Sequence, residues 1–215
     1  MRRFTPRLLF FIAMSAPVAA QSTDLLYRIE GTLNHFAGPE TTLEGAFIRF
    51  TGTIDSNAKP FADQKGRRSF AGDAPATVVV VGTTFADGVY TDALNHPMSI
   101  FVSDRAPSSD LLQVWHNGYF PLRGASGPRY EFEFTFSDST GEVFEGLGVP
   151  GTDVGLADFD DVFGWLTYPG DDGNVVFAYQ VAVTKFEIVP EPVTFFLLLI
   201  GAAALVFRRR TATSA

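Results

Sequence analysis

Aromatic and polar residues alternate one by one between positions 130 and 136. The aromatic members are Tyr130, Phe132, Phe134 and Phe136, and the residues between them are Glu131, Glu133 and Thr135. Successive side chains of a β-strand point to opposite faces, so this period of two predicts a strand with one aromatic face and one polar face. Few stretches of the chain show the three-and-four spacing of an amphipathic helix. The chain is therefore expected to fold around a sheet.

Short β-branched and aromatic runs predict further strands over residues 25–33, 43–54, 77–81, 98–103, 111–116 and 174–188. The continuous run 77–81 predicts a strand that is buried on both faces. Turn-forming Gly, Pro, Asp and Asn residues separate these runs, and residues 59–69 and 146–161 are expected to be loops. We therefore predict an all-β body, an antiparallel β-sandwich or jelly roll with many of the 22 Phe side chains inside.

The first 20 residues have the layout of a secretory signal peptide. A basic stretch over residues 1–7 precedes an apolar stretch over residues 8–16, and small residues at 18–20 precede Gln21. This order predicts export and removal of residues 1–20. A buried N-terminal helix is the weaker interpretation, because the segment has no polar face.

The C-terminal end carries three features in a fixed order. They are the tripeptide Pro190, Glu191 and Pro192, the uncharged residues 193–207, and the cluster Arg208, Arg209 and Arg210. Fifteen helical residues span about 22 Å, which is shorter than the roughly 30 Å hydrocarbon core of a bilayer. Long Arg side chains can reach the interface and extend a short span, and an arginine cluster marks the cytoplasmic side. We expect a transmembrane helix with the arginines as its stop-transfer signal and the body outside.

This combination resembles the C-terminal sorting signal of PEP-CTERM proteins, over residues 189–210. The resemblance implies that exosortase, a Cys-based membrane transpeptidase, cleaves near the tripeptide and releases or transfers the body. It also implies a transient inner-membrane anchor, followed by the cell surface or the exopolysaccharide matrix. Because neither proline can donate a backbone hydrogen bond and both fix φ, we expect the motif to be extended and outside regular structure.

The charge of the body argues against nucleic acid as a partner. Six of the 16 basic residues lie in the two ends, so residues 21–192 keep 10 Lys and Arg against 24 Asp and Glu, a net charge of −14. A phosphate backbone would be repelled. The chain has no cysteine, so disulfides, thiol catalysis and thiolate zinc sites are excluded.

No catalytic motif stands in a suitable context. Residues 146–151 match the GxGxxG spacing, but Pro150 interrupts the motif and no helix is predicted after it. His35, His96 and His116 are far apart and are expected to be loop or surface residues. We predict that the protein is not an enzyme. An extracellular hydrolase is the less favoured alternative, because acidic residues are numerous and nothing selects one pair.

Two clusters are candidate binding sites. Calcium takes six to eight oxygen ligands, which acid-rich loops can supply, and no other cofactor is expected. The candidate calcium ligands are Asp158, Asp160, Asp161, Asp171 and Asp172, with Asp153 and Asn174 nearby; a solvated acidic loop is the simpler interpretation. The candidate carbohydrate platform consists of Trp115, Tyr119 and Trp165, with Tyr168 close by, although large aromatic residues in a β protein more often belong to the core.

The chain therefore divides into a signal peptide (1–20), a β-sandwich domain (21–188) and a sorting signal (189–215). The first hypothesis is an exported, non-catalytic structural or adhesive module that exosortase sorts to the cell surface or the exopolysaccharide matrix. The second is a carbohydrate-binding module, with or without calcium, in the same location. Exosortase, exopolysaccharide and the membrane are the expected partners.

Overall fold

A computed structural model describes residues 24–38, 41–83, 87–92, 94–105, 109–119, 129–169 and 175–191. The predicted signal peptide, the apolar segment 193–207 and the arginine cluster lie outside these residues. Within the described residues, no helix has the length and apolar character needed to cross a membrane.

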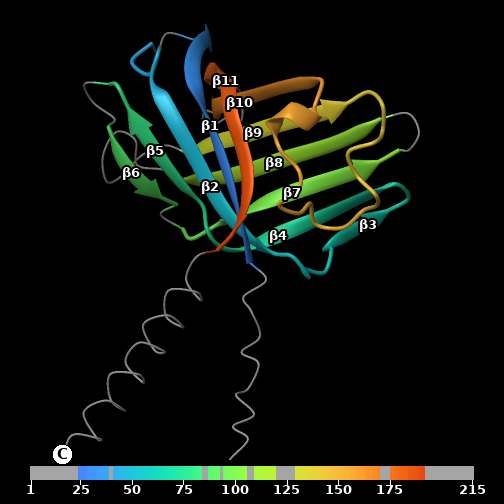
Figure 1. The fold of residues 1–215 in the computed structure, drawn as a ribbon. Coiled ribbons are helices and arrows are strands. Elements are labelled where there is room, and N and C mark those ends of the chain that lie inside the picture. The colour runs from blue at the N-terminus through green and yellow to red at the C-terminus, as the bar shows by residue number, and fades with distance from the viewer. Residues whose placement is uncertain are drawn as a thin grey trace, which may run out of the picture.

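The described chain is almost entirely antiparallel β-structure, which confirms the predicted all-β class (Figure 1). The strands are β1 (Asp24–Ala37), β2 (Phe47–Asp55), β3 (Ala62–Gln64), β4 (Arg67–Pro75), β5 (Thr77–Val81), β6 (Gly88–Thr91), β7 (Pro97–Asp104), β8 (Asp110–Tyr119), β9 (Arg129–Asp138), β10 (Asp161–Pro169) and β11 (Val175–Pro190). A short 3₁₀ helix, Leu156–Asp158, lies in the loop between β9 and β10. All strands belong to one sheet with the order β3-β4-β7-β8-β9-β10-β11-β1-β2-β5-β6.

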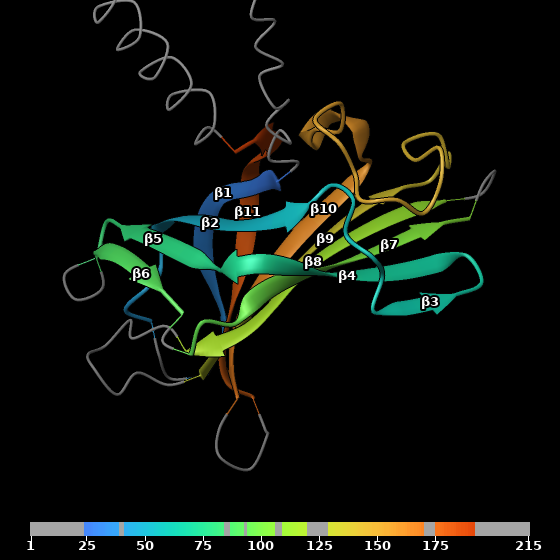
Figure 2. The same ribbon diagram turned by 90° about the horizontal axis from the view of Figure 1, so that it is seen from below.

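The sheet curls so that β4, near one edge, and β5, near the other edge, are consecutive in the chain. β4 pairs with β7, and β5, which follows it after one residue, pairs with β2 (Figure 2). A side chain on Gly72 of β4 would have its Cβ 2.4 Å from the carbonyl oxygen of Thr53 in β2, so glycine permits this close approach. The two layers expected of a β-sandwich are therefore parts of one continuous, curled sheet rather than two separate sheets.

Aromatic side chains fill the inside of the curl. The fully buried Phe50 of β2 lies 5.6 Å, ring centre to ring centre, from both Phe132 and Phe134 of β9. The same face of β9 also buries Tyr130 and Phe136. The alternation in the sequence thus identifies the inner face of the strand correctly, and Glu131 and Glu133 face outward.

Most predicted strands are confirmed, with several differences. Strand β6 was not among the predicted strands. The run 77–81 is not buried on both faces, because Val81 is half exposed and only Val78 and Val80 are buried. The predicted loop 59–69 contains β3 and the start of β4. Strand β10 follows the predicted loop 146–161 and was not among the predicted strands.

His116 is a core residue, so the prediction of a loop or surface histidine is wrong. Its position in β8 places it on the inner face with Leu112 and Val114. Its Nε2 lies 3.0 Å from Oδ2 of Asp92, and its Nδ1 lies 3.2 Å from the carbonyl oxygen of Pro97. Both side chains of the Asp92–His116 pair are fully buried.

The ionisation of this pair follows from its surroundings. Burial lowers the pKa of His116, and its contacts with the Pro97 carbonyl and the Asp92 carboxylate offset only part of that effect. Burial raises the pKa of Asp92, but hydrogen bonds from the N–H groups of Leu94 and His96 and the nearby His116 outweigh it, so the pKa is lowered. Asp92 therefore remains a carboxylate until the pH falls below the ordinary range of aspartate.

The depressed pKa of His116 predicts a loss of stability on mild acidification. A histidine in the unfolded chain takes up a proton at about pH 6.5, whereas the lowered pKa keeps folded His116 neutral there. The unfolded state therefore binds more protons, and the free energy of unfolding decreases as the pH falls. We expect the melting temperature to drop between about pH 7.5 and about pH 5.5, and His116→Gln to remove most of this dependence. The control His35→Gln, at an exposed imidazole, should retain it. A melting temperature that rises on acidification would show that the Pro97 carbonyl and the Asp92 carboxylate affect the pKa of His116 more than burial does.

Candidate functional site

Two tryptophans lie in one row across the outer face of the sheet. Trp115 of β8 is directly opposite Glu133 of β9, and Glu133 is directly opposite Trp165 of β10. Directly opposed residues of antiparallel strands share a face, and the residues on either side of each tryptophan face the core. Because neighbouring strands are about 4.8 Å apart, the two tryptophan positions are about 10 Å apart along the row. We call Trp115, Glu133 and Trp165 the outer aromatic row.

Neither tryptophan belongs to the core. Trp115 is 46% exposed, and Trp165 is partly exposed. Phe36, which is 64% exposed, contacts Trp165 edge-on, with ring centres 4.7 Å apart and planes at 77°. A bulge between His35 and Ala37 of β1 produces this contact, because it leaves Phe36 outside the strand pairing with β11. Phe36 therefore packs against the Trp165 ring on the outer face.

Polar side chains surround the row. Gln113 Nε2 donates hydrogen bonds to Glu133 Oε1 (3.1 Å) and to Thr135 Oγ1 (3.4 Å). The outward positions of residues 111–117, 131–137 and 161–167 hold no basic residue, and three of them are acidic: Glu131, Glu133 and Asp161. The face thus combines exposed aromatic rings with amide, hydroxyl and carboxylate groups and carries negative charge.

This arrangement suits the recognition of sugar rings. An aromatic ring offers a flat apolar surface to the C–H face of a sugar, while neighbouring amide and carboxylate groups can bond its hydroxyls. The outer aromatic row lies on the paired strands of a rigid sheet, so its side chains need little ordering when a ligand binds.

The structure brings together two of the three predicted carbohydrate residues. Tyr119 is the last residue of β8, and its backbone pairs with Arg129. Tyr168, which the sequence places close to Trp165, lies against Tyr130 and Phe177 instead. Tyr168 therefore packs with the core aromatic residues and does not extend the row.

The predicted calcium ligands that are described serve as acceptors within the loop. Asp158 Oδ2 accepts a hydrogen bond from the N–H of Gly155 (2.7 Å), and Asp160 Oδ2 accepts bonds from the N–H (2.9 Å) and hydroxyl (2.5 Å) of Ser139. Asp161 is exposed at the start of β10. Asp171, Asp172 and Asn174 lie outside the described residues. Asp158 and Asp160 thus hold turns in place, and calcium binding stays a prediction.

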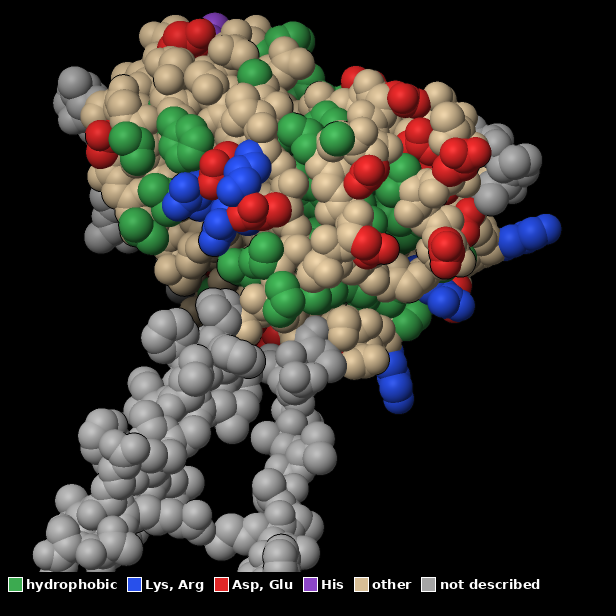
Figure 3. Space-filling view, in the orientation of Figure 1, with side chains coloured by type: hydrophobic (Ala, Val, Ile, Leu, Met, Phe, Trp, Pro, Cys, Tyr) green, Lys and Arg blue, Asp and Glu red, His purple; other side chains and the backbone are tan. Residues whose placement is uncertain are grey.

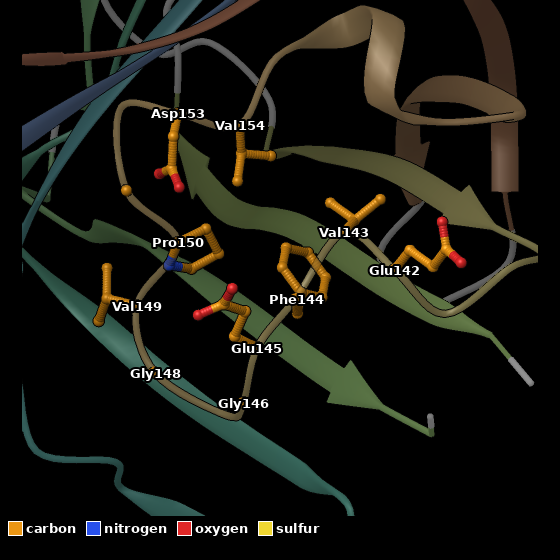
Figure 4. A pocket seen from close by; sticks show the side chains of 11 residues that line it. Glu142, Val143, Phe144, Glu145, Gly146, Gly148, Val149, Pro150, Asp153 and Val154 are labelled. Atoms are coloured by element: carbon orange, nitrogen blue, oxygen red, sulfur yellow. The ribbon is translucent and has the colours of Figure 1, made fainter. Parts of the chain in front are cut away.

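The loop between β9 and β10 also forms a hollow of about 460 Å³ on the acidic side of the molecule (Figures 3 and 4). Its acidic residues are Glu142, Glu145 and Asp153. Their carboxylates lie apart around the loop rather than meeting at one point (Figure 4). Among the described residues, no group of three or more His, Cys, Asp and Glu side chains is arranged to hold a metal ion.

Two buried aspartates that sequence analysis did not single out attach this loop to the sheet. Asp138 Oδ2 accepts hydrogen bonds from the Thr140 hydroxyl (2.8 Å) and from the N–H of Gly141 (2.7 Å), and Asp110 Oδ2 accepts one from the N–H of Phe144 (2.8 Å). Asp110 and Asp138 are directly opposed in β8 and β9. Burial raises the pKa of Asp138, but the hydrogen bonds from Thr140 and the following N–H groups outweigh it and lower the pKa.

The first residue of the tripeptide motif belongs to the sheet, and the second is hydrogen-bonded to it. Pro190 ends β11 and lies opposite Leu25 of β1, and the N–H of Glu191 donates a hydrogen bond to the carbonyl oxygen of Asp24 (3.0 Å). The expectation that the motif is outside regular structure is therefore wrong for Pro190. A proline can end a strand because the missing N–H is then not needed by the ladder. Pro192 lies outside the described residues.

Comparison of the chain with protein-family models, with curated proteins and with solved structures gives no match.

Proposed function

We propose that the protein is an exported, non-catalytic surface or matrix protein that binds polysaccharide through the outer aromatic row. The observation that carries the binding proposal is the placement of Trp115 and Trp165 in one row, on one face and outside the core. Exposed tryptophans in register are costly to leave in water, and a ligand that covers them removes that cost. Hydrogen-bonding groups between them supply orientation.

The route to the surface rests on the two ends of the sequence. Residues 1–20 direct export as a signal helix, and residues 193–207 anchor the chain in the inner membrane as a helix until exosortase acts at Pro190-Glu191-Pro192. The body then reaches the cell surface or the exopolysaccharide matrix, where a β-sandwich-like or jelly-roll-like module serves an adhesive role. In this proposal, calcium bound by the acidic loops assists polysaccharide binding but is not required for it.

The position of the two chain ends supports this route. β1 begins and β11 ends at the same end of the curled sheet (Figure 1), and the hydrogen bond between Glu191 and Asp24 joins them. A body attached through residues 192–215 would therefore be held at one end. The outer aromatic row lies in mid-strand on β8 and β10, away from that end.

Removal of the Trp115 ring is expected to weaken binding of the protein to exopolysaccharide about tenfold, the effect of losing about 1.4 kcal/mol of stacking. The measurement is co-sedimentation of purified full-length protein with exopolysaccharide from a producing strain. Trp115→Ala should leave the melting temperature nearly unchanged, because the side chain is outside the core.

Phe61→Ala is the matched control, since Phe61 is 65% exposed but belongs to the segment before β3, outside the row. Equal retention of Trp115→Ala and the unaltered protein would contradict binding through this face. Absence of any binding by the unaltered protein would contradict the polysaccharide proposal as a whole.

A further inference from the structure

The spacing of the outer aromatic row specifies the shape of its ligand. Trp115 and Trp165 are separated by one intervening strand, so their positions are about 10 Å apart, measured across the strands. In an extended β-1,4-linked glycan each ring is turned over relative to the one before it. Every second ring therefore presents the same face, and the repeat is one disaccharide. A disaccharide of such a chain spans about the distance between the two tryptophans, which is two strand separations.

The linkage matters because the row is nearly straight. The two tryptophans and Glu133 are in direct register, without a bulge between them. A flat, extended chain can contact both rings at once, whereas an α-1,4-linked chain of the same sugar curves into a helix and would leave one ring uncovered. The outer aromatic row thus distinguishes β-1,4-linked from α-1,4-linked chains of the same sugar, because only the extended chain contacts both tryptophans.

The charge of the face specifies a ligand without acidic groups. Glu133 lies between the two tryptophans, Glu131 is on the same face, and none of the outward positions of residues 111–117, 131–137 and 161–167 is basic. A uronic-acid chain would place its carboxylates beside these side chains, and like charges at that range repel. A neutral chain instead offers hydroxyl groups that can donate hydrogen bonds to the Glu133 carboxylate, which Gln113 already orients.

We infer that the outer aromatic row binds a neutral, extended β-1,4-linked polysaccharide of the cellulose type. The chain runs across β8, β9 and β10, with alternate rings on Trp115 and on Trp165. Phe36 of β1 contacts the Trp165 ring and adds a third aromatic side chain beside the bound chain. The inference rests on the proposed polysaccharide binding and adds the linkage, the charge and the direction of the bound chain.

The test measures binding of full-length protein, in detergent, to soluble cello-oligosaccharides by calorimetry. Cellohexaose can cover both rings and cellobiose only one, so we expect the hexaose to bind at least about tenfold more tightly. Trp115→Ala and Trp165→Ala should each reduce hexaose affinity to the cellobiose level, and Phe61→Ala should not change it. Glu133→Gln should raise the affinity for alginate oligomers relative to the unaltered protein, because it removes the carboxylate between the two tryptophans.

Amylose-derived maltohexaose and oligomeric alginate separate the possible failures. Binding of maltohexaose as tight as that of cellohexaose would overturn the linkage, and tight binding of alginate would overturn the charge argument. Either result, if it still depended on Trp115, would leave the proposed polysaccharide binding standing. Hexaose affinity equal to cellobiose affinity would overturn the two-ring geometry.

Discussion

Replacing Gly118 by alanine is expected to lower the free energy of unfolding by about 3–5 kcal/mol, the order of the cost of leaving a buried carboxylate without its partner. A Cβ atom at this position would lie 1.7 Å from Asp92 Oδ2 and 2.2 Å from His116 Nε2. These distances are far inside van der Waals contact, so either the buried pair or β8 must move. If the pair separates, the Asp92 carboxylate stays buried without the imidazole that compensates it.

Thermal unfolding followed by circular dichroism measures this effect. For a body of this size each kcal/mol changes the melting temperature by about 2–4 °C, so a drop of about 10 °C is expected. Gly148→Ala is the control, because Gly148 is exposed in the loop between β9 and β10 and a Cβ there meets nothing within 4 Å. A Gly118→Ala protein as stable as the control would mean that the buried pair tolerates displacement.

Strands whose two faces differ were predictable from the sequence. β9 shows this best, since each of its aromatic residues from Tyr130 to Phe136 is buried and Glu131 and Glu133 face outward. The period of two determines both the strand and its inner face without knowledge of its neighbours. β7 and β8 were predicted from short runs of β-branched and aromatic residues.

Strands near the free edges of the sheet were missed because their composition is polar. β3 and the first half of β4 form a hairpin with Arg67, Arg68 and Asp63, and the Arg68–Asp63 pair lies at 3.2 Å. Charged residues on edge strands limit pairing with other molecules, so polarity there is compatible with a strand. Pro75 of β4 lies at an irregularity in the pairing of β4 with β7. Local composition alone does not distinguish such an edge from a loop.

The candidate site was predictable as residues but not as an arrangement. Trp115 and Trp165 could be chosen for their chemistry, yet their common row depends on the registers of β8 with β9 and of β9 with β10. Those registers arise from packing across the whole core. Asp92, the partner of His116, lies 24 residues away and on a different segment, so no local pattern reveals the pair. The alternation of side chains along a strand could have placed His116 in the core, because positions 112, 114 and 116 share one face of β8 and Leu112 and Val114 are buried.

The register of β1 with β11 also changes how processing should be tested. Pro190 pairs with Leu25 and Glu191 is hydrogen-bonded to Asp24, so exosortase would have to meet a motif whose first residue is part of the sheet. Strand ends open locally at little free-energy cost, and such opening would present the motif to a membrane enzyme. A variant of the motif can therefore alter processing in two ways. It can weaken recognition by exosortase, or it can change how readily the end of β11 opens.

Replacement of Pro190, Glu191 and Pro192 by alanine is expected to leave uncleaved protein in the inner membrane. The backbone of alanine can make the hydrogen bonds of the strand end, so the body should stay folded while the recognition residues are lost. Immunoblotting of fractionated cells measures the ratio of uncleaved to processed chain. Val189→Ala is the matched control, because it changes the adjacent residue of β11, opposite Leu26, and leaves the motif intact. Equal accumulation in both variants would point to the strand end rather than the motif, and unchanged processing of the triple variant would contradict sorting through this tripeptide.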